Sequence, residues 1–222
     1  MCKKIELKTL RIGVLALQGD VSEHIDITNA TLREMGLEGE AVMVKEKDRL
    51  DEIHGLIIPG GESTTIGRVA ERYEMISKIK SAALSGMPIF GTCSGLILMA
   101  KKVRDAKIGE TNQPTLGLLD VEVIRNAFGR QRESFEISLK IPKIGKNPFP
   151  GVFIRAPAIA SILSKDVEVL ASYEDKIVAV QQNNLIGIAF HPELTDDTRL
   201  HEFFIEMILK SPFKDRISKF NS

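Results

Sequence analysis

The sequence contains no tryptophan, only two cysteines and no excess of charge of either sign. Two cysteines, Cys2 and Cys93, are too few for a disulfide framework, so we expect a protein of the reducing cytoplasm. The 30 basic residues balance the 30 acidic ones, so the composition implies no basic face for nucleic acid. Residues 1–9 contain no apolar signal core. The apolar stretch 87–100 is shorter than the roughly 20 residues that span a bilayer, so we expect no membrane segment.

What remains is the composition of an ordinary globular protein, with 43% hydrophobic and 27% charged residues among 222. A chain of this length can bury a sizeable core, and no repeat, low-complexity tract or long linker divides it. We therefore expect one domain over residues 1–222, with residues 1–9 as an N-terminal extension.

Apolar runs of strand length alternate with amphipathic stretches through the first hundred residues. This alternation predicts an α/β fold in which helices cover both faces of a mostly parallel central sheet. We expect Ser63 or Thr64 to cap a short helix after the strand at 55–58. After residue 102, a turn-rich insert at 105–114 precedes short runs that indicate a smaller antiparallel portion. The expected strands are 11–17, 41–44, 55–58, 87–90, 119–124, 135–139, 152–154, 167–171, 177–180 and 185–189, and the clearest helices are 21–35, 75–84 and 198–209.

The stretch Gly91-Thr92-Cys93-Ser94-Gly95 joins an expected strand to an expected helix. Glycines two residues before and two residues after a central nucleophile match the nucleophile-elbow pattern, with cysteine in place of serine. Neighbouring side chains would collide in so sharp a turn. The thiol would lie at a helix N-terminus, where unpaired N–H groups favour a thiolate. A free cysteine is commonly an inert core residue, but both glycines and the strand–turn–helix context favour Cys93 as a nucleophile.

Four histidines are candidates for the base that a nucleophilic cysteine needs. His24 and His201 lie on expected helices and His54 lies in a charged connection, so we expect structural or surface positions for all three. His191 differs, because it follows a strand at the edge where parallel sheets carry their functional loops.

Pro192 favours an extended backbone at His191, so that Glu193 faces the same side as the imidazole. A carboxylate there can orient the ring and stabilise its positive charge. Alone, His-Pro-Glu is typical of a strand-end turn. Together with the cysteine elbow it predicts a triad of Cys93, His191 and Glu193.

Acyl transfer also needs donors for an oxyanion, and two places offer them. One is the backbone N–H of Ser94, which follows the nucleophile. The other is Gly61 in the loop 59–63 (PGGES), because glycine lets the backbone approach a ligand closely. This loop lacks the Walker spacing and lysine of a phosphate site. One cysteine and scattered histidines supply no cluster of metal ligands, so we expect no metal.

The motifs GTCSG, PGGEST and FHPE together resemble a class I, or triad, glutamine amidotransferase domain of flavodoxin-like fold. Longer strings narrow the resemblance to the family of glutaminase subunits of two-component pyridoxal 5′-phosphate synthases, from about residue 10 to the last helix. These strings are LALQGD (15–20), GLIIPGGEST (55–64), RNAFGRQRESFE (125–136), GVFIRAP (151–157) and FHPELTDD (190–197).

The resemblance implies that Cys93 is the nucleophile and that His191 and Glu193 form its relay. Ser94 stands where alanine is more usual, a change we expect to be harmless if only its N–H matters. The implied glutamine-binding residues are Gly61, Glu62, Ser63, Arg125, Ile154 and Arg155. Their chemistry agrees, since arginine pairs with a carboxylate in a planar fork and a glutamate suits the substrate's ammonium group.

The implied reaction is hydrolysis of L-glutamine through a cysteine thioester. By resemblance, ammonia passes through a tunnel to a (β/α)₈-barrel synthase subunit in a hetero-oligomer, where it is combined with ribose 5-phosphate and glyceraldehyde 3-phosphate. This chain would need no cofactor, because pyridoxal phosphate is the partner's product. Residues expected near the partner are Gln18, Arg130 and Arg132.

The adjacent glycines at 60–61 allow either the C=O or the N–H of their peptide to face the site. We therefore expect the isolated chain to be a poor glutaminase until its partner docks. Three alternatives stay open: a glutaminase for histidine or purine synthesis, a cysteine or γ-glutamyl peptidase on the same scaffold, and a non-catalytic binding subunit. The RNAFGRQ and GVFIRAP strings argue against the first, a peptidase would need no synthase partner, and the intact triad argues against the last.

Overall fold

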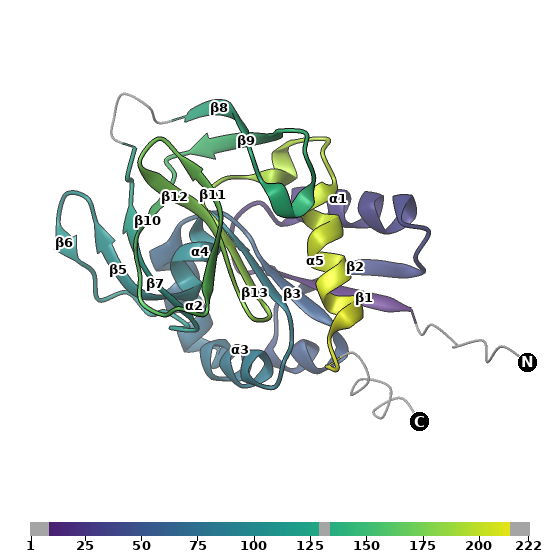
Figure 1. Cartoon of the computed structure of the whole chain (residues 1–222). Helices are drawn as coiled ribbons and strands as arrows, with labels where there is room; N and C mark the ends of the chain where they lie inside the picture. Colours follow the sequence, from purple (N-terminus) through teal and green to yellow (C-terminus); the bar gives the residue numbers. More distant parts are fainter. Residues whose placement is uncertain (1–8, 129–133, 214–222) are drawn as a thin grey trace, which may run out of the picture.

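The computed structural model describes residues 9–128 and 134–213, and Figure 1 shows how their helices and strands are arranged. The expected N-terminal extension therefore lies almost wholly outside the described residues, as do Arg130 and Arg132. Within the described ranges, no helix is both long enough and apolar enough to cross a membrane.

Most strands of the described chain join one sheet, in the order β2-β1-β3-β4-β13-β12-β10-β7-β5-β6, with β11 paired to β12 outside this path. A separate antiparallel pair consists of β8 (Ser134–Leu139) and β9 (Phe149–Ile154). The strands of the large sheet are β1 (Leu10–Leu15), β2 (Gly39–Val44), β3 (Gly55–Ile58), β4 (Ile89–Thr92), β5 (Ala100–Asp105), β6 (Gly109–Glu110), β7 (Leu119–Arg125), β10 (Ala158–Ile162), β11 (Val167–Tyr173), β12 (Lys176–Gln182) and β13 (Leu185–Ile188).

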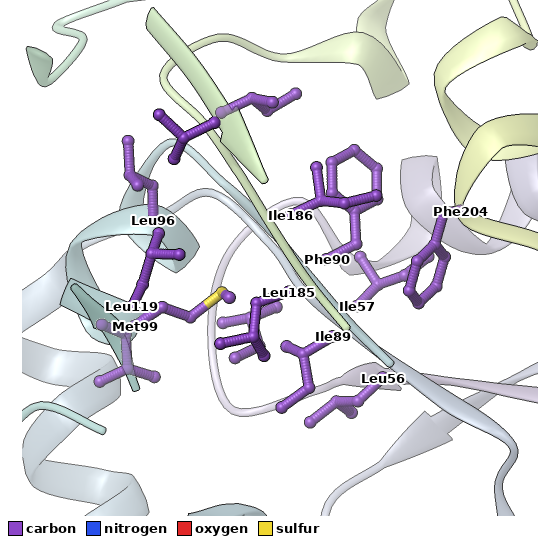
Figure 2. Packing of buried hydrophobic residues seen from close by; sticks show 14 of the residues in the cluster. Leu56, Ile57, Ile89, Phe90, Leu96, Met99, Leu119, Leu185, Ile186 and Phe204 are labelled. Carbon is purple, nitrogen blue, oxygen red and sulfur yellow. The ribbon is translucent and has the colours of Figure 1, made fainter. Parts of the chain in front are cut away.

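The first half of the sheet is parallel, and its central strands β3, β4 and β13 are buried along their whole length. Phe90 lies opposite Ile57 on one side and Ile186 on the other, so the three side chains form a row across one face. Figure 2 shows this row directed toward Phe204, whose ring centroid is 5.5 Å from that of Phe90. The alternating row, on the opposite face, is Leu56, Ile89 and Leu185.

Helices cover both faces of the parallel half, which confirms the predicted α/β class (Figure 1). The pair α1 (Val21–Glu34) and α5 (Arg199–Lys210) lies on one face. The other face carries α2 (Ser63–Arg72), α3 (Met75–Leu84) and α4 (Ser94–Met99). Short 3₁₀ turns connect some elements: η1 (Lys47–Glu52), η3 (Pro142–Ile144) and η4 (Pro192–Leu194).

The second half of the sheet is mainly antiparallel, through the pairs β13–β12, β12–β10 and β10–β7. Three of its strands, β5, β6 and β10, were not predicted, and β6 lies inside the expected turn-rich insert. Strand β5 carries charged side chains at exposed positions and buries only Ala100 and Val103 well, so it has no clear apolar run. Its pairing with β6 and β7 is what makes it a strand.

Candidate active site

The candidate nucleophile lies in the turn between β4 and α4. Cys93 follows Thr92 directly, and its φ of 49° and ψ of −101° are values that a non-glycine residue rarely adopts. A Cβ atom on Gly91 would lie 2.7 Å from the backbone carbonyl carbon of Gly95. A Cβ atom on Gly95 would lie only 2.0 Å from the carbonyl oxygen of Ile58. The steric reason predicted for the two glycines is confirmed.

The candidate base follows β13, the strand next to β4. The N–H of Cys93 donates to the carbonyl of Ile188 at 2.9 Å, so paired main chains set the spacing between the two turns. His191 Nδ1 lies 2.6 Å from Glu193 Oε1, and these side chains are 5% and 0% exposed. The prediction of an extended His-Pro-Glu segment is wrong, because Pro192–Leu194 form the 3₁₀ turn η4. This turn nevertheless brings the carboxylate to the ring.

A second carboxylate, which was not predicted, faces the same imidazole. Asp20, in the loop between β1 and α1, places Oδ2 3.4 Å from His191 Nδ1. Burial acts to lower the pKa of His191, but hydrogen bonds with Asp20, Cys93 and Glu193 outweigh it and raise the pKa to about 12. The hydrogen bond to His191 lowers the pKa of Asp20. By contrast, burial raises the pKa of Glu193 despite its bond to the imidazole.

Asp20, His191 and Glu193 each place one possible metal-ligand atom within 4.8 Å of the others, a spacing that would suit one metal ion. His191 Nδ1 is the ring nitrogen that faces both carboxylates, so a metal there would replace the N–H that binds them. We interpret the cluster as an imidazolium paired with two carboxylates, because those contacts account for the grouping.

These side chains border a cavity of about 350 Å³. Its walls come from the segments that follow β1, β3, β4, β7, β9 and β13, so it lies mainly at the carboxyl ends of the parallel strands. Of the described residues predicted for the site, all but the buried Glu193 line the cavity. The lining residues are Gln18, Gly19, Asp20, Gly61, Glu62, Ser63, Cys93, Ser94, Ile97, Arg125, Asn126, Ile154, Arg155 and His191.

Glu62 and Arg125, predicted to bind the charged ends of glutamine, face each other, with 3.5 Å between Arg125 Nη2 and Glu62 Oε1. The Glu62 carboxylate also caps α2, accepting from the N–H of Thr64 at 3.2 Å and of Thr65 at 2.7 Å. Burial acts to raise the pKa of Glu62, but hydrogen bonds from Thr65 and Thr64 lower it overall. The prediction that Ser63 or Thr64 caps the helix is wrong, because Glu62 has the extended backbone of a cap and Ser63 is already helical.

Gln113 comes from the insert 105–114, to which sequence reasoning assigned no role. Its Oε1 accepts from Arg125 Nη1 at 3.0 Å and from Ser63 Oγ at 3.3 Å. The insert therefore supports two of the residues predicted to bind glutamine.

Two side chains hold the predicted oxyanion loop. The Ser94 hydroxyl donates to the carbonyl oxygen of Gly61. The N–H of Glu62 donates to Gln18 Oε1 at 2.6 Å. The contact of Ser94 with the loop is thus not limited to its N–H, and Gln18, expected near a partner, contacts the loop from within the site.

Ile154 and Arg155 form the cavity wall at the end of β9. The sulfur of Cys93 lies 4.0 Å from the carbonyl oxygen of Ile154. Arg155 has a φ of 42°, a left-handed conformation that is uncommon for a non-glycine residue and often marks a functional site.

Sequence reasoning missed five residues of the site, which are Gly19, Asp20, Ile97, Gln113 and Asn126. Asp20 follows the parallel strand β1, so the rule that selected His191 also applies to it. His24 and His201 were expected in structural or surface positions, and both are fully buried. Gly19 and Asn126 are chain neighbours of the predicted residues Gln18 and Arg125. Ile97 lies one turn after Cys93 on α4. Gln113 alone of the five reaches the site from a distant segment, the insert 105–114.

The sequence is similar to those of known proteins. A profile of the SNO glutamine amidotransferase family matches residues 14–210. The pyridoxal 5′-phosphate synthase subunit PdxT of Pyrococcus furiosus is 51% identical over 201 residues, which are 90% of this chain and 100% of that protein. The PdxT subunit of Methanosarcina barkeri is 48% identical over 202 residues, which are 91% of this chain and 100% of that protein.

Solved structures show the same likeness. One crystal structure of a glutamine amidotransferase has a TM-score of 0.78 at 45% identity, covering 89% of this chain and 98% of that one. A glutamine amidotransferase from Thermotoga maritima has a TM-score of 0.56 at 15% identity, covering 91% and 85%, and this likeness concerns the fold alone.

Proposed function

The chain belongs to the SNO glutamine amidotransferase family, as its motifs predicted, and we propose that it is the glutaminase subunit of a pyridoxal 5′-phosphate synthase. In this role it hydrolyses L-glutamine to glutamate and ammonia, which is channelled to a synthase subunit. The observation that carries the proposal is that Cys93 and His191 line one cavity while Glu193 is paired with His191, in a chain about half identical to such subunits along most of its length.

Hydrolysis begins with the Cys93 thiolate beside a protonated His191. The sulfur attacks the side-chain amide carbon of glutamine, a C–S bond forms, and the amide oxygen becomes an oxyanion. His191 gives its proton to the amide nitrogen, the C–N bond breaks, and ammonia leaves a thioester. The neutral imidazole then takes a proton from water, whose oxygen attacks the thioester and releases glutamate. Cys93 leaves as a thiolate, again facing an imidazolium.

Substrate recognition follows from the pairing of Glu62 with Arg125. A glutamine zwitterion can replace this one ion pair with two, its ammonium at Glu62 and its carboxylate at Arg125. The N–H of Ser94 and the Gly61 segment are the proposed donors to the oxyanion, where one donor contributes roughly 10²–10³ in rate.

The proposed partner is a (β/α)₈-barrel synthase subunit that combines ammonia with ribose 5-phosphate and glyceraldehyde 3-phosphate. Similarity over 90% of this chain to pyridoxal 5′-phosphate synthase subunits favours this pathway over histidine or purine synthesis and over a peptidase. A catalytic thiol must stay reduced, which supports a cytoplasmic location. No cofactor is assigned to this chain.

The test is to mix the chain with such a synthase subunit and supply nitrogen either as glutamine or as an ammonium salt. We expect pyridoxal 5′-phosphate from both sources with the wild-type chain. With Cys93→Ala, we expect product from ammonium alone, because only the release of ammonia from glutamine needs the thiol. Glutamine-dependent product with Cys93→Ala would refute the assignment.

A second arm measures glutamate release by the chain alone and after addition of the synthase subunit, at saturating glutamine. We expect a large rise in kcat when the partner is present. An equal kcat in both conditions would refute dependence on the partner but leave the nucleophile assignment intact.

A further inference from the structure

Two buried histidines lie behind the carboxylate of the proposed triad, on the side away from the cavity. His24 of α1 and His201 of α5 are both 0% exposed. His24 Nε2 is 3.3 Å from Glu193 Oε2 and 3.0 Å from the hydroxyl oxygen of Thr92, the residue before the nucleophile. On the other side of the ring, His24 Nδ1 is 3.4 Å from His201 Nε2. The chain of contacts therefore runs from α5 through α1 to the triad.

Both rings are neutral at ordinary pH. Burial lowers the pKa of His201 to about 3. Burial, together with repulsion from His201 and His191, lowers the pKa of His24 well below its usual value. A neutral imidazole carries one N–H and one lone pair, so each ring must present its N–H to one side only.

The contacts select one arrangement of these protons. A carboxylate oxygen only accepts, so His24 must carry its hydrogen on Nε2, toward Glu193 and the Thr92 hydroxyl. His24 Nδ1 is then a lone pair, and it accepts from His201 Nε2–H. This leaves a lone pair on His201 Nδ1, which has no hydrogen-bond partner among the described residues.

The carboxylate of Glu193 needs a hydrogen-bond donor such as the Nε2–H of His24. Its Oε1 accepts from His191. Its buried Oε2 makes the 3.3 Å contact with His24 Nε2, which that nitrogen shares with the Thr92 hydroxyl, but no well-aligned hydrogen bond in the described part of the chain. Burial favours the neutral carboxylic acid, and a neutral acid no longer stabilises an imidazolium. An N–H on the second oxygen favours the carboxylate.

We propose that His24 is a positioning residue for glutamine hydrolysis, whose Nε2–H keeps Glu193 ionised and turned toward His191, and that His201 fixes the tautomer of His24. This inference rests on the proposed function. It concerns a histidine pair that touches neither the cavity nor the reacting atoms.

Other charged groups also act on this cluster. Asp20 faces His191 from the loop before α1, Cys93 faces it from the elbow, and Arg155 lines the cavity from β9. None of the three is altered by a substitution at His24, so each acts equally in the variant and in the wild type.

The test compares His24→Leu, which removes the N–H, with His24→Gln, which keeps an amide N–H at similar reach. We expect kcat to fall about ten- to a hundredfold in His24→Leu, the range for a charged group that loses one hydrogen bond, with KM for glutamine nearly unchanged. We expect His24→Gln to recover a large part of kcat. The acid limb of the kcat profile should move to higher pH in His24→Leu, because Glu193 then stays protonated to higher pH.

The matched control is His54→Leu. His54 is also buried, but it bonds to the backbone of Arg11 at the opposite end of the parallel strands. We expect His54→Leu to change stability without moving the pH profile. If His24→Leu and His24→Gln lose activity equally and neither moves the acid limb, His24 is only a packing residue and the proposal is wrong.

Two measurements need no glutamine and so separate this inference from the proposed function. Nitrogen-15 spectra of the wild-type imidazoles should show His24 and His201 as neutral Nε2–H tautomers at pH 7, and an Nδ1–H tautomer at His24 would overturn the proposal. The pH midpoint for alkylation of Cys93 by iodoacetamide should rise in His24→Leu, and an unmoved midpoint in a folded variant would also overturn it. If these results hold while the synthase gains no ammonia from glutamine, the function is wrong and the histidine pair stands.

Discussion

The charge on Glu193 can be removed without changing the shape of its side chain, in the substitution Glu193→Gln. The amide oxygen can still accept from His191 Nδ1, now 2.6 Å from Glu193 Oε1. The amide NH₂ then takes the place of Oε2 and meets His24, which must turn its lone pair toward it. The imidazolium loses one of its two carboxylates and keeps only Asp20, whose side chain is 38% exposed.

The size of the effect follows from the charge that is lost. A hydrogen bond to a charged group contributes about 1.5–3 kcal/mol. In a serine protease, replacement of the triad carboxylate by its amide lowers kcat by about 10⁴-fold. A thiol ionises more readily than a hydroxyl, and Asp20 remains, so we expect a smaller fall of about 10²-fold, or roughly 2.7 kcal/mol.

Stability should respond differently. Burial raises the pKa of Glu193 above 4.5, so the folded state favours the protonated carboxyl group. This stabilisation is complete below pH 4.5 and is lost as the pH rises through the raised pKa. At pH 8 the neutral amide of Glu193→Gln avoids the free-energy cost of burying a carboxylate, but it also loses the charged hydrogen bond to His191. The two effects oppose each other, so we expect Tm to change by less than about 4 °C.

The assay is glutamate release at saturating glutamine with the synthase subunit present, beside a thermal melt of the same preparation. Glu206→Gln is the control, because Glu206 pairs with Lys210 on the exposed side of α5. We expect no change in kcat for the control. A kcat within fivefold of the wild type in Glu193→Gln would refute the reasoning and leave Glu193 as a turn residue.

Three further substitutions test the site. Cys93→Ser should abolish glutamine hydrolysis and leave the melt unchanged, and turnover near the wild-type rate would remove Cys93 from the mechanism. Ser94→Ala loses one neutral hydrogen bond to Gly61, so kcat should fall by no more than about tenfold, measured as glutamate release. Asp20→Asn removes a carboxylate that raises the pKa of His191, so the alkaline limb of kcat/KM should move to lower pH, and an unmoved limb would contradict this role.

The parts of the fold that were predictable are those encoded by local pattern. The buried strands β3, β4 and β13 are short apolar runs, and the elbow glycines form a short motif. A Cβ on Gly91 would clash within the turn, whereas a Cβ on Gly95 would clash with Ile58 of β3. Strand β5 was missed because its exposed positions are charged and its order comes from its neighbours. The cap of α2 was assigned to the wrong residue because serine and threonine are the commoner caps, whereas here the longer Glu62 side chain reaches Thr65.

In the candidate site too, the residues that follow a local sequence pattern were predictable and those brought together by tertiary packing were not. Cys93 and His191 were predictable because each follows a strand at the active edge of a parallel sheet. His24 and His201 were not placed near the triad, because they are separated by 177 positions along the chain and meet only when α1 packs on α5. Gln113 reaches Arg125 from a turn-rich insert that carries no motif.

The nucleophile and the base inherit their positions from two hydrogen-bonded strands in the middle of the sheet, where Ile188 of β13 lies opposite Thr92 of β4. Amides of such buried central strands exchange with solvent mainly through global unfolding, whereas loops open locally at little cost. Gln18 and residues 59–62, which shape the substrate side, lie on loops. Rising temperature or denaturant will therefore disturb glutamine binding and the oxyanion loop well before it separates the sulfur from the imidazole. The relative position of Cys93 and His191 therefore depends on the stability of the central sheet. The loops that contact the substrate can change conformation without unfolding of that sheet.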